Sequence, residues 1–358
     1  MIARKPVIIT GLDIGSSKIS AVASEIDRTG RFRIIAQVTN ASKGVQRGSI
    51  TDLDNATDAV SKALRALRDK ISGNPGDIYV NISGRDVRGS LSKGMVPISL
   101  RGREVTRSDI KRCIDAAATI SLPFDREIIH AIPRSFSVDD QRAVKDPLGL
   151  YASRLSCEVY ILTAGLNHIQ NIYKCVNAAG YDVREVVFTA IADGASLLES
   201  DEKEKGVALI DLGSSLTQIS IFCDNALFDI YTIELGASDI GDDYRQSAEF
   251  NGLVTRIGAY LADISGRTGR QLPVTLTGGM ALTDGVVEFF EEKLSRPVRL
   301  GVAKDIRGDI SGPDSVRLPT SIGLAKYACE KYSKRLAEGK TLVKGLSAKV
   351  VDIFNNYF

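Results

Sequence analysis

Two segments far apart in the chain share the pattern Asp-x-Gly-Ser-Ser, which combines a carboxylate, a glycine and two hydroxyls. The first is Gly11–Lys18, GLDIGSSK, and the second lies within Ala208–Phe222, ALIDLGSSLTQISIF. In both segments an apolar run leads into the motif, and a second run with strand character follows it. This arrangement predicts a β-hairpin with the polar residues at its tip.

The tip of such a hairpin has the groups that phosphate binding needs. Gly15 lets the backbone approach a ligand closely, and consecutive N–H groups with two hydroxyls can surround phosphate oxygens. Lys18 adds a positive charge, and Asp13 is placed to hold a hydrated magnesium ion. A single copy is explained equally well as an ordinary turn, because Asp-x-Gly is common in turns.

The second copy favours the phosphate interpretation. Two such hairpins indicate two similar half-domains, which would face each other and clamp a triphosphate and its metal ion from both sides. The predicted phosphate-binding residues are Gly15, Ser16, Ser17, Lys18, Gly213, Ser214 and Ser215. The predicted magnesium ligands are Asp13 and Asp211.

The composition argues against several other classes of protein. A chain of 358 residues, 44% hydrophobic and 25% charged, is globular and long enough for about two or three domains. A net charge of +2 gives no reason to expect nucleic-acid binding. The five cysteines lack metal-binding spacing, and His130 and His168 are far apart, which disfavours a zinc site or a histidine-dependent mechanism. No run is long enough for a signal peptide or a membrane span, so we expect a cytoplasmic protein.

The elements around the first hairpin predict an α/β half-domain. A third strand is expected over Phe32–Asn40, and a helix capped by Asp52 follows at helical apolar spacing. The buried strand Ile78–Ile82 comes next.

A segment of different character then interrupts this half-domain. It contains a short strand at Gly94–Ile98, a helix capped around Thr106, and strands at Arg126–Asp139 and Ser156–Leu162. This order predicts a compact strand-helix-strand-strand module inserted into the first domain.

The second hairpin is followed by elements that could hold a base or a ribose. After the strand Leu227–Leu235 we expect two helices, around Asp239–Ala248 and Leu253–Ile264, and then the apolar strand Leu272–Leu276. That strand runs into Thr-Gly-Gly-Met at 277–280. A glycine pair between a strand and a helix provides a flat surface for a nucleoside, although a helix start that needs close packing explains it equally well.

The last residues, Lys340–Phe358, have the pattern of an amphipathic helix. Apolar residues form one stripe of this helix, and lysines lie off it. The predicted membrane-binding residues are Lys349 and the residues of the stripe: Val343, Leu346, Val350, Ile353, Phe354 and Tyr357. A terminal helix that docks on the core or on a partner is the alternative. The polar stretch at 333–339 is expected to be a linker, which favours a helix lying on an anionic membrane.

Together these features resemble the actin-like ATPases and, more narrowly, the FtsA family, bacterial division proteins that link FtsZ filaments to the membrane. The matching stretches cover nearly the full chain and are GLDIGSSK, VNISGRDV, GMVPIS, HAIPRSFSVDD, DPLGLYASRLSCEVYILTA, GYDVREVVFTAIADG, ELGASDIGDD and LTGGMAL. The resemblance implies an α/β, actin-like (ribonuclease H-like) fold of two domains, in which the inserted module replaces an actin-type subdomain.

The resemblance also implies domain boundaries. The first half would span 1–84, completed by about 164–200 and 300–332, with the inserted module at 85–163. The second half would span 201–300, followed by the linker at 333–339 and the membrane-targeting helix at 340–358. One departure lies at about 237–270, which is shorter than the FtsA subdomain that contributes nucleotide contacts and the groove for the FtsZ tail.

By the same resemblance the cofactors would be ATP and Mg²⁺, with the adenosine bound by Gly278, Gly279 and Met280. The expected partners are further copies of the chain in actin-like filaments, the FtsZ C-terminal peptide or another divisome protein, and the membrane at the division septum. Hydrolysis would be weak at most, because Asp193 is the sole polar residue expected at the hinge to position water.

Two other functions remain open at this stage. A PilM-type scaffold of type IV pilus assembly shares the fold and the inserted module, and it binds a peptide of an inner-membrane partner without a lipid-binding helix. A sugar kinase would need a catalytic aspartate and sugar-binding residues in the interdomain cleft, and the sequence has no such cluster.

Overall fold

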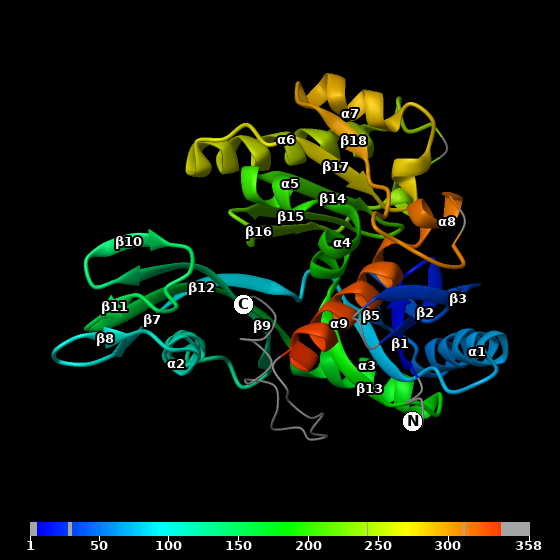
Figure 1. The fold of residues 1–358 in the computed structure, drawn as a ribbon. Coiled ribbons are helices and arrows are strands. Elements are labelled where there is room, and N and C mark those ends of the chain that lie inside the picture. Colours follow the sequence, from blue (N-terminus) through cyan, green and yellow to red (C-terminus); the bar gives the residue numbers. More distant parts are fainter. Residues whose placement is uncertain (1–5, 28–30, 242, 311, 338–358) are drawn as a thin grey trace.

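The computed structural model describes residues 6–27, 31–241, 243–310 and 312–337 (Figure 1). The last helix, α9 (Pro319–Ala337), extends through the start of the stretch 333–339, so the expectation of a linker there is wrong for its first residues. The predicted membrane-binding residues lie outside the described residues: Val343, Leu346, Lys349, Val350, Ile353, Phe354 and Tyr357. None of the described helices is both long and apolar enough to cross a bilayer.

The first half-domain is built on a five-stranded sheet in the order β13-β6-β1-β2-β3. Strands β1, β2 and β3 form an antiparallel meander, and β6 and β13 run parallel to β1. The strands are β1 (Val7–Ile14), β2 (Lys18–Ile26), β3 (Phe32–Ala41), β6 (Asp77–Ile82) and β13 (Val183–Phe188).

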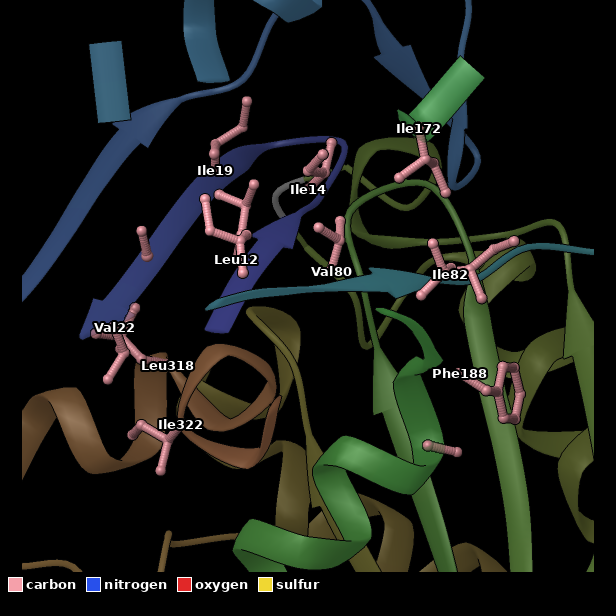
Figure 2. Close-up of a cluster of buried hydrophobic side chains, with 14 of the residues drawn as sticks. Leu12, Ile14, Ile19, Val22, Val80, Ile82, Ile172, Phe188, Leu318 and Ile322 are labelled. Carbon is pink, nitrogen blue, oxygen red and sulfur yellow. The ribbon is translucent and has the colours of Figure 1, made fainter. Parts of the chain in front are cut away.

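Helices cover both faces of this sheet. Helix α1 (Leu53–Ile71) begins at Asp52, whose side chain accepts a hydrogen bond from the Asn55 N–H, and packs with α3 (Leu166–Ala178) on one face. Helices α4 (Thr189–Leu197) and α9 pack against each other on the other face. Figure 2 shows buried apolar side chains around the first hairpin, which come from β1, β2, β6, β13, α3 and the chain around the start of α9.

The inserted module is a four-stranded sheet in the order β10-β9-β12-β7 with one helix, α2, on one face. Its main elements have the predicted order of strand, helix, strand and strand, and three short strands are added. The elements are β7 (Arg88–Pro97), β8 (Arg103–Glu104), α2 (Arg107–Ala118), β9 (Arg126–Val138), β10 (Gln141–Val144), β11 (Tyr151–Ala152) and β12 (Arg154–Gly165). The other face of the sheet lies toward β16 of the second half-domain, where the Tyr160 hydroxyl donates to Asp229 at 3.0 Å.

The second half-domain repeats the topology of the first. Its sheet has the order β16-β15-β14-β17-β18, with an antiparallel meander followed by two parallel strands. The elements are α5 (Ser200–Lys205), β14 (Val207–Leu212), β15 (Thr217–Cys223), β16 (Ala226–Ile233), α6 (Ala248–Thr268), β17 (Val274–Thr277), α7 (Val286–Leu294) and β18 (Val298–Leu300). Helices α6 and α7 pack their apolar faces on one side of this sheet.

The region between β16 and β17 differs from the prediction of two helices. One long helix, α6, begins at Ser247, whose hydroxyl accepts a hydrogen bond from the Phe250 N–H. The expected helix around Asp239–Ala248 is instead a 3-10 turn over Ala237–Asp239 followed by irregular backbone. Gly241 has a φ of +78° there, which a helix does not accommodate.

The chain crosses between the half-domains twice. It leaves the first through α4 and α5, and it returns from β18 through α8 (Gly312–Arg317) into α9, so the second half-domain sits above the first in Figure 1. The tips of the β1–β2 and β14–β15 hairpins therefore meet at the boundary between the two halves.

Candidate functional site

A cavity of about 340 Å³ lies between the half-domains. The two hairpin tips line it together with the β17 exit and the α8–α9 junction. The predicted residues that line it are Asp13, Gly15, Ser16, Ser17, Lys18, Asp211, Gly213, Ser214, Ser215, Gly278 and Gly279. Residues from two distant segments of the chain are thus brought to one space, which is wide enough for several phosphate groups.

The two hairpin tips have the same backbone geometry. The Gly15 N–H donates to the Lys18 carbonyl at 3.0 Å, and the Gly213 N–H donates to the Leu216 carbonyl, also at 3.0 Å. A Cβ on either glycine would lie 2.9 Å from that same carbonyl oxygen. Both turns are therefore closed too tightly for a side chain, and glycine is required for this shape rather than only tolerated.

The two tips also contact each other. The Ser215 hydroxyl donates to the Ser16 hydroxyl at 2.9 Å and accepts from the Arg47 N–H at 3.0 Å. The second tip has further contacts within its own half: the Ser238 hydroxyl and N–H donate to the Ser214 carbonyl at 2.7 and 2.8 Å, and the Ala237 N–H donates to the Gly213 carbonyl at 3.0 Å. Two of the hydroxyls predicted to bind phosphate, those of Ser16 and Ser215, are thus bonded to each other.

Three carboxylates stand close together behind the tips. Asp13 is buried, and desolvation raises its pKa to about 6, although the nearby Lys18 ammonium opposes the rise. Desolvation and the Asp13 charge raise the pKa of Asp211 to about 6 as well. Desolvation, followed by the Asp211 charge, raises the pKa of Asp193 well above its usual range. Such a site favours a bound cation, which would compensate the clustered negative charge.

These carboxylates fit a magnesium ion that keeps much of its water. Within the described residues no group of three or more His, Cys, Asp or Glu side chains has the arrangement of a complete metal cage. Magnesium commonly uses one or two carboxylates plus phosphate oxygens and water. Asp13 and Asp211 both line the cavity, as that kind of binding requires.

Asp193 lies beside the cavity and does not line it. It is 1% exposed on α4, and its Oδ1 accepts a hydrogen bond from the Thr320 hydroxyl at 2.8 Å. Thr320 lines the cavity, so Asp193 reaches a ligand there only through another group.

The glycine pair after β17 closes another side of the cavity. Gly278 has a φ of +90°, and a Cβ there would collide with the Asp211 carboxylate, whereas a Cβ on Gly279 would meet open space. Met280 corrects the prediction, because its side chain is 6% exposed and packs into the core of the second half-domain. The 3-10 turn over Met280–Leu282 points Met280 inward, and Leu282 lines the cavity instead.

The structure adds lining residues that the sequence analysis did not single out: Gly48, Asn81, Ser83, Thr189, Leu216, Ala237, Leu282, Val316, Arg317, Pro319 and Thr320. Asn81 could have been identified from the sequence, since it is an amide within an otherwise apolar run. Its Oδ1 accepts from the Ile14 N–H at 2.7 Å and so orients the first tip. Nothing in the sequence pointed to Arg317, yet its carbonyl accepts a hydrogen bond from the Lys18 ammonium.

Comparisons with known proteins agree with this architecture. The family model described as the SHS2 domain inserted in FtsA matches residues 84–163, the region of the inserted sheet. The cell division protein FtsA of Pseudomonas aeruginosa is 29% identical over 91% of this chain and 90% of its own length. FtsA of Borreliella burgdorferi is also 29% identical, over 91% of this chain and 92% of its own.

Among solved structures, a chain of the PilM–PilN type IV pilus biogenesis complex superposes with a TM-score of 0.66. It is 13% identical, and the match covers 90% of this chain and 98% of that one. Paired half-domains with the same sheet order and facing loops define an actin-like fold. Over about nine tenths of its length the chain is similar to FtsA cell division proteins, and its inserted region matches the domain described as inserted in FtsA.

Proposed function

We propose that this protein is a nucleotide-dependent, self-assembling adaptor of cell division. It would bind ATP with Mg²⁺ between its half-domains and attach FtsZ filaments, or another divisome component, to the inner face of the cytoplasmic membrane. The observation that supports nucleotide binding best is the pair of Asp-x-Gly-Ser-Ser tips, which line one cavity and touch through Ser16 and Ser215.

The residues would divide the work of binding. Backbone N–H groups and hydroxyls of the two tips would hold the phosphates, and Lys18 would neutralise part of their charge. Asp13 and Asp211 would hold magnesium, which supplies further positive charge to the phosphate oxygens when bound. Gly278 and Gly279 would lie against the adenosine, where the open space beside Gly279 leaves room for it.

The site favours a switch over an efficient enzyme. Asp193, the residue predicted to position water, does not line the cavity, and its carboxylate accepts a hydrogen bond from Thr320, which does. We therefore expect ATP to be turned over slowly, with Asp193 affecting the rate indirectly through Thr320.

Membrane attachment would come from the tail at 340–358. Its apolar stripe and flanking lysines match a helix that lies in the membrane interface. Filament formation between copies would multiply this weak attachment, because linked binding sites gain avidity. The proposed partner of the second half-domain is the FtsZ C-terminal peptide or another divisome protein. The region at 237–270, which is shorter than the FtsA subdomain, is where that partner would be expected to bind.

The test is co-sedimentation with anionic and neutral vesicles in the presence of ATP and Mg²⁺. We expect the full chain to pellet with anionic vesicles, and a variant ending at Gly339 to stay in the supernatant. Phe354→Glu, on the apolar stripe, should abolish pelleting, whereas Asn355→Glu adds the same charge off the stripe and should retain most of it.

A pilus-type scaffold is the second candidate, supported by the superposition on the PilM–PilN chain. It requires no lipid-binding tail. If the full chain and the shortened variant both stay in the supernatant, the membrane adaptor is wrong and a peptide partner should be sought. Calorimetric titration with ATP and Mg²⁺ tests the nucleotide part separately.

A further inference from the structure

The turn between β4 (Val45–Gln46) and β5 (Ser49–Ile50) is a third loop at the cavity. Arg47 and Gly48 both have positive φ, at 48° and 77°, so the chain reverses between two directly paired residues. Gly48 lines the cavity beside the two hairpin tips. The proposed function assigns no role to this short hairpin.

One side of the turn contacts the second half-domain. The Arg47 N–H donates to the Ser215 hydroxyl at 3.0 Å, and that hydroxyl donates to Ser16 at 2.9 Å. The turn and the two tips thus share one hydrogen-bonded hydroxyl. A phosphate group that recruits Ser215 as a donor must compete with the bond to Ser16.

The other side of the turn contacts the point where the chain enters the inserted module. A Cβ on Gly48 would lie 2.5 Å from the Ser83 hydroxyl, and a Cβ on Gly84 would lie 2.9 Å from the Arg47 carbonyl. Both glycines have positive φ, at 77° and 102°. The backbone of the turn therefore packs directly on the backbone at 83–84, between β6 and β7, and neither glycine accepts a side chain.

His168 connects the same turn to the point where the chain leaves the module. It lies in the first turn of α3, directly after β12, and its Nε2 is 2.9 Å from the Gly48 carbonyl. A carbonyl oxygen only accepts hydrogen bonds, so Nε2 carries the proton. His168 is 9% exposed, which makes this a buried hydrogen bond with little competition from water.

Asp86 ties the two connections together. Its carboxylate accepts from the Gly165 N–H at 2.6 Å and from Arg126 Nη1 at 3.2 Å, and it lies 3.6 Å from His168 Nδ1. Entry strand, exit strand and β9 therefore meet at one carboxylate. A displacement of the turn would act on both connections of the module at once.

We propose that the turn at 46–49 couples phosphate occupancy at Ser215 to the inserted module, with His168 as the positioning residue that transmits it. The coupling rests on the proposed nucleotide function. Nucleotide would shift the Ser215 hydroxyl, the turn would follow through the Arg47 N–H, and His168 and Asp86 would pass the change to the module root. The reverse also follows: a partner that holds the module would change nucleotide affinity by the same factor.

The experiment is hydrogen–deuterium exchange with mass spectrometry on the full chain, with and without ATP and Mg²⁺. In the wild type we expect nucleotide to change amide exchange at the module root, residues 84–88 and 163–168, by about fivefold or more. His168→Phe keeps a ring but cannot donate to Gly48, and it should lose this response while still binding nucleotide.

Two further variants separate coupling from damage to the fold. His168→Gln places an amide N–H near the position of Nε2 and should restore the response. His130→Phe removes the other buried histidine, whose Nε2 accepts from the Phe188 N–H at 3.0 Å away from the turn, and should keep it.

The outcomes distinguish the two proposals. Binding of nucleotide without a response at the module root overturns the coupling alone, as does an equal response in His168→Phe. A wild-type chain that binds no nucleotide overturns the proposed function, and the coupling falls with it.

Discussion

The two hairpin tips have the same backbone hydrogen bonding but differ in the side chains around it. Each carries Asp-x-Gly-Ser-Ser and closes with the same hydrogen bond from a glycine N–H. At the third residue after that glycine, however, the first tip has Lys18 and the second has Leu216. Lys18 donates to the Arg317 carbonyl, whereas Leu216 is 7% exposed.

The strand residues that face the aspartates differ as well. Ser20 lies opposite Asp13, and its hydroxyl bonds to both Asp13 and Ser321. Gln218 lies opposite Asp211, and its buried amide has no hydrogen-bond partner among the described residues. If the tips bind phosphate as proposed, both would contribute hydroxyls and backbone N–H groups, and the charged side chain would come from Lys18 in the first half-domain.

The largest effect should come from exchanging the residues that differ at the tips. Lys18→Ala removes a charge-assisted bond to phosphate, and we expect ATP affinity to fall about 10- to 100-fold, since such bonds contribute roughly 1.5–3 kcal/mol. Leu216 also lines the cavity but has no charge to lose, so Leu216→Ala should lower the affinity much less than Lys18→Ala does. Titration with a fluorescent ATP analogue at fixed salt measures both, and equal losses of affinity would contradict the asymmetry.

The shared carboxylates predict a pH dependence. With the pKa of Asp13 and Asp211 raised to about 6, metal must displace protons as the pH falls below that value. Magnesium-dependent ATP affinity should therefore drop by roughly tenfold per competing proton between pH 7 and 5. The same raised pKa means that the metal-free fold gains stability from these groups as pH falls through 6, because the folded state then binds protons that the unfolded state does not. Calorimetry at each pH checks the affinity, and a flat profile would exclude these two ligands.

The contact between the tips should have a smaller effect. Ser215→Ala loses two hydrogen bonds and Ser16→Ala loses one, each with a net contribution of about 0.5–1.5 kcal/mol. We expect Ser215→Ala to lower the midpoint of urea unfolding more than Ser16→Ala does, without nucleotide. The opposite order would mean that the Arg47 N–H finds another acceptor.

The smallest effect concerns the strand residues. Gln218→Leu replaces an unpartnered buried amide by an apolar group, and it should be neutral or raise the unfolding free energy by about 1 kcal/mol. Ser20→Ala should instead lower it, because Asp13 and Ser321 lose a partner. Thermal unfolding of both variants measures the difference. A destabilised Gln218→Leu would show that solvent satisfies the amide.

Local patterns were sufficient for the parts of the fold that depend on neighbours in sequence. The hairpins follow from alternating apolar residues around a tight turn, and helix α1 follows from its cap and its helical spacing. The repeated motif also led to two similar half-domains, which the matching strand orders confirm.

Prediction failed where a residue's surroundings come from elsewhere in the chain. The segment around Asp239–Ala248 has helical character locally, yet its backbone turns at Gly241. Just before it, the N–H groups of Ala237 and Ser238 donate to carbonyls of the second tip. Met280 follows the glycine pair as a nucleoside contact would, but the core of the second half-domain takes its side chain.

The two loops and the residues that each presents could be predicted from local sequence. The contact between the loops through Ser215 and Ser16 could not, and neither could the presence of Gly48, Arg317 and Thr320 beside them. The physical reason is that a loop's shape depends on its own backbone and hydrogen bonds, whereas its partners depend on how the surrounding sheets and helices bury their apolar faces. That packing brings together residues separated by hundreds of positions, and no local pattern records it.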